Sequence, residues 1–301
     1  MEDPQSIGLW RRLRSKPGGR FLLRLVSYGL ALFVAIPYAL SSVLLRAQRR
    51  PVSPPERGFQ LIHVVSQGLK LRAWLNPCVP TGRPALVIAH GLDDSLESYV
   101  SIAQAFRRRG HSVLLLDLRG HGGSEGRYTT LGGLEREDVR AAMRSLDQRH
   151  LAEAGYILLG VSMGGVAALR AAADRLDVRA VVAEAPFDTY RDTVAHHAWL
   201  YYRLPHWVPW IPLSIAFAEW RAGFDADSVD ALAAARQTRA PLLLIADAED
   251  PRMPEGVVRR VLDAHPGPKR LWVCPGADHA GAANNPDYLK NVIGFLKEND
   301  T

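Results

Sequence analysis

One serine lies between glycines in a context that would make it a nucleophile. Residues 160–164 read Gly-Val-Ser-Met-Gly, and another glycine follows at position 165. The apolar run Tyr156–Leu159 before it is typical of a buried strand, and the Ala-rich segment Met163–Arg175 after it is typical of a helix. A sharp strand-to-helix turn exposes such a serine above the sheet edge, and the first helix amides favour negative charge beside it. Ser162 is therefore the candidate nucleophile, and the alternative is a helix N-cap serine in a glycine-rich turn.

A serine hydroxyl is a poor nucleophile at neutral pH unless a neighbouring base takes its proton. The chain has ten histidines. Two of them lie late in the sequence: His265 ends an expected helix, whereas His279 lies in a loop, residues 275–281, between an expected strand and the final helix. Three carboxylates follow the apolar run Leu242–Ile245 and compete for the role of orienting acid, namely Asp247, Glu249 and Asp250.

The sequence resembles the α/β-hydrolase superfamily from about Gly58 to Asn299. Four landmarks occur in the order of that family. His90-Gly91 follows the third expected strand, and Asp117–Ser124 (DLRGHGGS) resembles a D-x-R-G-x-G-x-S turn after the fourth. The serine turn comes third, and the acid and histidine regions come last. Within the superfamily the chain is most similar to the monoglyceride-lipase and serine-aminopeptidase-like group, which includes N-terminally anchored Bem46-like proteins.

The resemblance implies a catalytic triad of Ser162, Asp250 and His279. Placing Met253-Pro254 on the end of the family pattern G-x-x-D-x-x-V/I-P aligns Asp250 with the acid, while Asp247 stands where the family usually has glycine. The family also implies an oxyanion hole formed by the backbone N–H groups of Leu92 and Met163. These groups would bind the negative charge of a tetrahedral intermediate.

The function implied is that of a serine hydrolase that cleaves carboxylic esters through an acyl-serine intermediate. A membrane-anchored serine peptidase, amidase or thioesterase is the first alternative, because one scaffold hosts many chemistries. A non-catalytic membrane-bound scaffold of the same fold is the second. The sequence has no zinc-spaced His/Cys cluster and no P-loop, so we expect neither a metal nor another cofactor.

The rest of the body alternates strands with helices. This pattern predicts an α/β fold with a mostly parallel sheet covered by helices on both faces. Phe59–Val65 and Leu69–Leu75 predict a hairpin. The further expected strands are 85–89, 113–116, 156–159, 178–183, 241–246 and 270–273, and the expected helices are 95–109, 134–150, 163–175, 255–264 and 286–298.

Residues 187–239 interrupt this alternation and are too long for one crossover. The segment is rich in aromatic side chains and predicts a helical cap inserted into the hydrolase domain, residues 59–301. We expect its aromatics to pack on one another or to line an apolar pocket, with His196, His197 and His206 as candidates to face that pocket. The cap favours a small-molecule or lipid-like acyl substrate.

The N-terminal part predicts a membrane anchor. Residues 25–45 form 21 consecutive uncharged positions, enough to cross a bilayer as a helix. A basic segment, residues 1–24, precedes them, and a proline-rich linker, residues 46–58, follows. The heavier basic flank places the N-terminus in the cytoplasm and the hydrolase domain on the far, extracytoplasmic side. The alternatives are a signal peptide cleaved near residues 39–41 and a buried core helix.

Charge and cysteine usage exclude two further classes of protein. Residues 1–57 carry ten Lys or Arg and three acids, a net charge of +7, whereas the other 244 residues carry 27 cations and 28 acids. The body therefore has no basic surface for nucleic acid. Cys78 follows the expected hairpin and Cys274 follows the last expected strand, and the fold keeps these strands apart, so we expect two free thiols and no disulfide framework. The sequence does not predict an oligomeric state.

Overall fold

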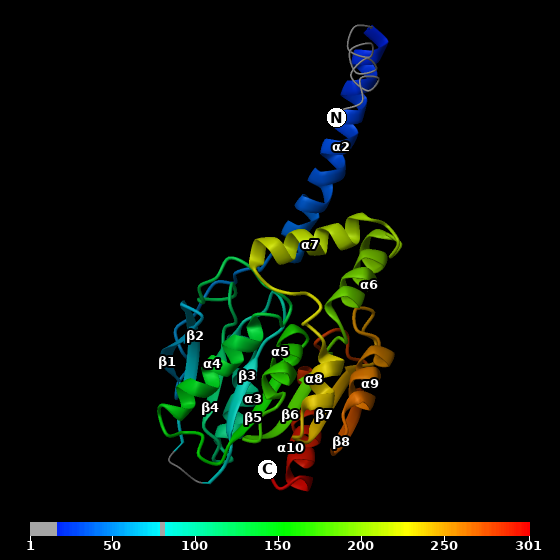
Figure 1. The fold of residues 1–301 in the computed structure, drawn as a ribbon. Coiled ribbons are helices and arrows are strands. Elements are labelled where there is room, and N and C mark those ends of the chain that lie inside the picture. Colours follow the sequence, from blue (N-terminus) through cyan, green and yellow to red (C-terminus); the bar gives the residue numbers. More distant parts are fainter. Residues whose placement is uncertain (1–16, 79–81) are drawn as a thin grey trace.

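The computed structural model describes residues 17–78 and 82–301. An eight-stranded sheet crosses the body in the order β1-β2-β4-β3-β5-β6-β7-β8 (Figure 1). β2 runs antiparallel to both of its neighbours, and the other strands pair in parallel. The strands are β1 (Gln60–Ser66), β2 (Leu69–Asn76), β3 (Ala85–Ala89), β4 (Val113–Leu116), β5 (Tyr156–Val161), β6 (Val178–Glu184), β7 (Leu242–Asp247) and β8 (Lys269–Cys274). The predicted hairpin and the mostly parallel sheet are confirmed.

Helices cover both faces of this sheet. α4 (Glu135–Asp147), α5 (Met163–Ala172), α8 (Ala231–Gln237) and α9 (Glu255–Ala264) share one apolar core with it. α3 (Val100–Arg107) and α10 (Tyr288–Glu298) share the other, and the short 3₁₀ helices η1 (Leu96–Tyr99) and η2 (Ala282–Asn284) lie on that side. β3 shows the alternation, since Ala85, Val87 and Ala89 face the first core and Leu86 and Ile88 the second.

Most expected helices end earlier than the apolar pattern does. The helix expected over residues 134–150 ends at Asp147, because His150 takes a left-handed backbone conformation with φ 55°. The first turn of the segment expected as helix 95–109 is the 3₁₀ helix η1. The final helix begins at Tyr288 instead of residue 286. These shifts leave the order of the elements unchanged.

The segment between β6 and β7 contains three helices. α6 (Tyr190–Tyr202) and α7 (Trp210–Ala222) form the cap, whereas α8 packs against α5 and α9 and belongs to the layer that covers the sheet. The Thr189 side chain caps α6 by accepting a hydrogen bond from the Asp192 amide. Arg203 and Gly223 directly follow α6 and α7, and both take a left-handed backbone conformation that ends the helix.

Of the two expectations for the cap aromatics, packing on one another as a small core is not met by the exposed rings, whereas Trp199 and Trp207 line a cavity. Five of the cap aromatics are exposed: Trp199, Tyr201, Tyr202, Trp207 and Trp220. The cap instead packs through its other residues, with Ile211, Ser214, Ile215 and Ala218 forming the buried face of α7.

α2 (Pro17–Leu44) leaves the body as a long apolar helix (Figure 1). Only 6% of its most apolar window is buried, so the buried-core alternative for this segment is wrong. Its last turns pack on α7, where the rings of Tyr38 and Phe217 meet edge to face with centroids 5.6 Å apart. The helix is long and apolar enough to span a membrane. The predicted basic segment lies largely outside the described residues, since its first 16 residues are not among them.

The proline-rich segment 46–58 has no helix or strand, as expected of a linker, but it is bound to the body. The Gln48 amide donates to Asp93 Oδ1 at 3.0 Å, and Arg50 Nε donates to the Asp93 carbonyl at 2.7 Å. Further along, the Ser53 amide donates to Glu97 Oε1 at 2.9 Å. These hydrogen bonds fix the segment beside the loop that follows β3. Elsewhere, Cys78 and Cys274 are both free thiols, as the sequence predicts.

Candidate active site

Ser162 lies on a strained turn at the carboxyl end of β5. Its backbone has φ 51° and ψ −115°, a conformation that costs a non-glycine residue free energy. The flanking glycines make the turn possible. A Cβ atom at Gly160 would lie 2.2 Å from the Gly164 carbonyl oxygen, and one at Gly164 would lie 2.2 Å from the Ala89 carbonyl oxygen. The close approach of three backbone segments therefore explains the Gly-x-Ser-x-Gly spacing.

The loop after β8 brings His279 to this serine. His279 Nε2 lies 3.0 Å from Ser162 Oγ, and its Nδ1 lies 2.6 Å from Asp250 Oδ2. The Asp250 side chain is fully buried, while that of His279 is 15% exposed. With Nδ1 donating to the carboxylate, Nε2 is free to accept the hydroxyl proton. The three residues expected from the sequence thus form one hydrogen-bonded chain.

The three carboxylates that compete for the role of orienting acid differ in their contacts and exposure. Asp250 Oδ1 accepts hydrogen bonds from the Arg252 amide at 2.7 Å and the Met253 amide at 3.0 Å. Burial alone would raise the pKa of Asp250, but the hydrogen bond and positive charge of His279, with these two amides, hold it below its usual value. Glu249 is exposed. Asp247 accepts from the Ala280 amide at 2.8 Å, so it binds the histidine loop and not the imidazole.

The loop after β3 lies against the serine turn. A Cβ atom at Gly91 would lie 3.6 Å from Ser162 Cβ, which places the expected oxyanion loop next to the nucleophile. Neither the Leu92 nor the Met163 amide donates a backbone hydrogen bond to another of the described residues. Both amides are therefore available to a ligand oxygen.

The buried His90 side chain holds this loop in place through two hydrogen bonds. Its Nδ1 donates to the Gly91 carbonyl at 2.6 Å, and its Nε2 accepts from the Leu118 amide at 3.0 Å. Burial, with the neighbouring His121, lowers the pKa of His90 to about 4, so the ring is neutral as this pattern requires.

Buried ion pairs hold the Asp117–Ser124 turn in place next to the loop that follows β3. Asp117 Oδ1 accepts from the Leu96 amide at 2.9 Å, and its Oδ2 accepts from Arg72 NH1 at 2.9 Å. Arg119 and Asp138 form a second buried pair at 2.6 Å. His121 is buried with its Nδ1 on the Arg119 carbonyl, so its role is structural, as expected.

A pair of buried acids binds the histidine loop, and the sequence pointed to only one of them, Asp247, and only as a candidate for the triad. Glu184 ends β6 and accepts from the Ala282 amide at 2.9 Å, next to the contact between Asp247 and Ala280. Burial, with the charge of Asp247, raises the pKa of Glu184 to about 8, and burial raises that of Asp247 to about 6. In the sequence, the only indication of this pair is that each acid follows an apolar run expected to be a strand.

The other histidines divide between the cap and the body. His196 Nε2 lies 2.8 Å from the Pro251 carbonyl oxygen, which ties α6 to the loop that carries the acid. Burial, with the charges of His196 and His279, lowers the pKa of His197 to about 4. His206 lines a cavity of about 440 Å³ in the cap, together with Ala195, His196, Trp199, Pro205 and Trp207. His265 is buried and its Nδ1 lies 3.1 Å from the Ala235 carbonyl, so its role is structural, as expected.

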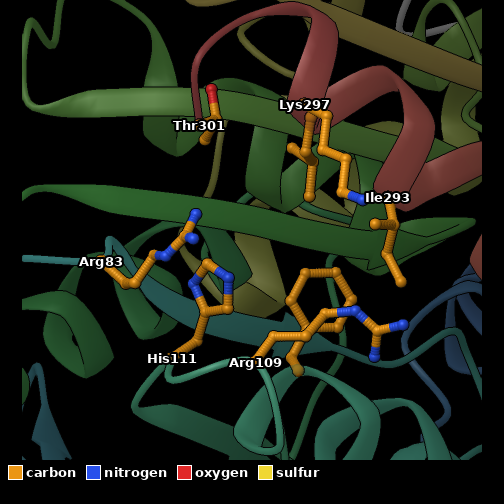
Figure 2. A pocket seen from close by; sticks show the side chains of 8 residues that line it. Arg83, Arg109, His111, Ile293, Lys297 and Thr301 are labelled. Atoms are coloured by element: carbon orange, nitrogen blue, oxygen red, sulfur yellow. The ribbon is translucent and has the colours of Figure 1, made fainter. Parts of the chain in front are cut away.

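A second cavity has a volume of about 260 Å³, and Figure 2 shows the side chains that line it. Arg83, Arg109 and His111 line it from the segments that precede β3 and β4, and Ile293 and Lys297 line it from α10. It therefore opens at the amino ends of the strands, whereas Ser162 follows the carboxyl end of β5. Among the described residues, no group of three metal-binding side chains occurs.

Comparisons with known proteins agree with the fold. The family model described as serine aminopeptidase, S33, matches residues 81–223, a segment that contains the serine turn and ends before Asp250. An esterase from Pyrococcus furiosus has a similar structure, with a TM-score of 0.65, 23% identity, and coverage of 84% of this chain and 97% of the esterase. The chain therefore has the α/β-hydrolase fold, and its residues 81–223 match the serine aminopeptidase family model.

Similar sequences come from several organisms. The protein YqkD of Bacillus subtilis, described as uncharacterized, is 29% identical over 215 residues, which cover 70% of each chain. A monoglyceride lipase of Rattus norvegicus is 31% identical over 133 residues, which cover 42% of each chain. A putative esterase/lipase of Haemophilus influenzae is 38% identical over 87 residues, which cover 29% of this chain and 28% of that protein. The chain is thus similar to hydrolases of the esterase and lipase type.

Proposed function

We propose that this protein is a serine hydrolase that cleaves carboxylic esters with lipophilic acyl groups. One observation carries the proposal: Ser162 Oγ, His279 and Asp250 form a continuous hydrogen-bonded chain, with contacts of 3.0 and 2.6 Å, at a strained turn. Strain of this kind persists only where the surrounding structure enforces it, and it is concentrated at functional sites.

The reaction proceeds in two acyl-transfer steps. Ser162 Oγ attacks the ester carbonyl carbon while His279 Nε2 takes its proton, and the carbonyl oxygen becomes an oxyanion bound by the Leu92 and Met163 amides. The carbon–oxygen bond to the leaving alcohol then breaks, and His279 returns the proton to that alcohol. Water, activated by His279, attacks the acyl-serine, and the acid is released with Ser162 restored. Asp250 holds the imidazole in the productive tautomer and stabilises its protonated form. No cofactor enters these steps.

The amide-cleaving alternative is favoured by the description of the matching family model, serine aminopeptidase. Recognition of a peptide N-terminus would require unpaired carboxylates near the site. Several cap acids instead have partners: Asp188 pairs with Arg260, and Asp227 and Glu219 both pair with Arg191. This pairing supports the ester over the amide.

Two assays test the proposal. A fluorophosphonate probe should label the wild-type chain and leave Ser162→Ala unlabelled. Equal labelling of both chains, or of neither, would refute the proposed hydrolase activity and favour the non-catalytic scaffold. A panel of p-nitrophenyl esters of increasing chain length, measured beside aminoacyl anilides, should show a preference for the longer esters. A preference for the anilides would favour the peptidase alternative.

We further propose that α2 is an uncleaved anchor, with the N-terminus in the cytoplasm and the hydrolase domain on the opposite side of the membrane. Arg221 on α7 donates hydrogen bonds to Ser41 Oγ at 2.6 Å and Ser42 Oγ at 2.8 Å. Cleavage near residues 39–41 would break this contact, which supports retention of the helix. The chain should remain in the pellet after carbonate extraction, and protease added outside spheroplasts should digest the body.

A further inference from the structure

The outward face of α7 has the composition of a lipid-facing surface. Pro212, Ala216 and Trp220 are exposed and recur at i, i+4 and i+8, so they form one stripe along the helix. The only two charged residues of α7 point elsewhere: Glu219 accepts from the Ala226 amide at 2.8 Å, and Arg221 binds α2. A helix that faces water normally carries charges on its outer side. This stripe carries none.

Exposed aromatic rings also occur at the end of α6 and in the connection to α7, where Trp199 and Trp207 line the cap cavity. Trp207 and Trp220 are 73% and 75% exposed. We define the aromatic docking face as Trp199, Tyr202, Trp207, Pro212, Ala216 and Trp220. Tryptophan and tyrosine concentrate where an apolar phase meets water, because their rings are apolar and their N–H and O–H groups are polar.

The position of α2 indicates what covers this face. A bilayer core takes about 20 helical residues, and the uncharged run begins immediately after Arg24, so it crosses the core by about residue 44. The last turns of that same run pack on α7, since Pro37 and Ser41 are buried there and Tyr38 meets Phe217. α7 lies across the foot of α2 (Figure 1). A helix packed against the end of a membrane span lies at the level of the lipid headgroups.

We propose that the aromatic docking face lies in the headgroup layer of the bilayer that α2 crosses, so that α7 is a second, interfacial membrane element. This inference rests on the proposed anchor role of α2. The interface between α2 and α7 fixes the depth of the face, and the bilayer then holds the cap on the side of the body where Ser162 lies.

Fluorescence quenching tests the position of the face. The full-length chain is reconstituted in phosphatidylcholine liposomes that contain lipid brominated near the top of its acyl chains, with Trp10→Phe in every variant. The reference chain is compared with one that also carries Trp199→Ser, Trp207→Ser and Trp220→Ser. Removing these three of the six tryptophans that remain after Trp10→Phe should remove most of the lipid-quenchable emission. Returning tryptophan at position 220 alone should restore part of it. Thermal unfolding in detergent verifies that each variant is folded.

Leu176 provides the matched control. It is 77% exposed and follows α5, at the end of the sheet opposite Ser162. Leu176→Trp in the background without the three indoles should be quenched by aqueous acrylamide and not by brominated lipid. Equal lipid quenching with and without the three indoles would overturn the proposal. Indoles reached by neither quencher would show that a second copy covers the face, which also overturns it.

Carbonate extraction of the same liposomes distinguishes failure of the docking-face proposal from failure of the proposed anchor role of α2. Protein released into the supernatant refutes the anchor and the docking face together. Protein that stays in the pellet without lipid quenching at positions 199, 207 and 220 refutes the docking face alone. Neither result depends on the catalytic role of Ser162.

Discussion

His279 Nε2 lies 3.0 Å from Ser162 Oγ although 117 residues separate them in the chain. Both follow the carboxyl ends of strands, β8 and β5, in a sheet whose parallel strands bring those ends to one edge. The loop that carries His279 is held by two buried acids, Glu184 and Asp247, and its imidazole by a third, Asp250. The geometry of the proposed triad therefore depends on three acids with different roles.

Asparagine substitutions should separate these roles. Asp250→Asn removes the acceptor that fixes the imidazole tautomer and should lower kcat by about 10⁴-fold. Asp247→Asn keeps an oxygen for the Ala280 amide and should cost less than about tenfold, or 1.4 kcal/mol of transition-state stabilisation. Hydrolysis of a p-nitrophenyl ester by the two detergent-purified variants measures both effects. The reverse ranking would make Asp247 the acid of the triad.

Glu184 should make the stability of the fold depend on pH. Its pKa is about 8 in the folded chain and near 4.5 when unfolded, so the folded state binds more protons between these values. The free energy of unfolding should therefore fall as pH rises through this interval, by up to about 1.4 kcal/mol per pH unit. Glu184→Gln keeps the acceptor for the Ala282 amide and should flatten the dependence. Thermal unfolding between about pH 6.5 and 8, above the pKa of Asp247, is the measurement. Parallel slopes for both chains would contradict the prediction.

Gly164→Ala should disrupt the serine turn. The new Cβ would lie 2.2 Å from the Ala89 carbonyl oxygen, a contact that only a shift of β3 or α5 could relieve. We expect a loss of about 1–3 kcal/mol or more in the free energy of unfolding, as for overpacking at a rigid site. Gly294→Ala is the control, because a Cβ there meets nothing within 4 Å in the middle of α10. It should stabilise the protein by about 0.5–1 kcal/mol. Chemical denaturation in detergent compares the two, and equal stabilities would refute the steric argument.

Arg221→Met should loosen the junction between α2 and α7. The substitution leaves Ser41, which is buried, without the hydrogen bond from the guanidinium, and should cost about 1–3 kcal/mol. Arg259→Met removes an exposed ion pair with Glu255 four residues earlier and should cost less than about 0.5 kcal/mol. Limited proteolysis near residues 42–48 should accelerate only in Arg221→Met. Equal acceleration in both variants would argue against a fixed junction.

Local pattern was enough to predict the strands, most helices and the serine turn. A buried strand such as Ala85–Ala89 is a continuous apolar run, and a strand-to-helix turn around Ser162 needs its glycines wherever it occurs. Helix ends were less predictable, since the apolar pattern continues past Asp147 while the backbone turns at His150. The apolar N-terminal helix could also be recognised by its length and composition alone.

The side-chain environments could not be read from the sequence. The cap aromatics were expected to pack on one another or to line a pocket, yet five of them are exposed, and two of these, Trp199 and Trp207, line a cavity. Segment 46–58 looked like a free linker because its partners, Asp93 and Glu97, are distant in sequence. Nothing in the local pattern distinguishes Glu184 from other acids at strand ends.

The sequence by itself determined the alternation of strands and helices, the strained serine turn and the long apolar helix, because each depends on neighbouring residues. The tertiary structure decided which carboxylate meets His279, where Glu184 and Asp247 lie, and which face of α7 stays uncovered. These depend on contacts between segments far apart in the chain, which only the packed sheet brings together.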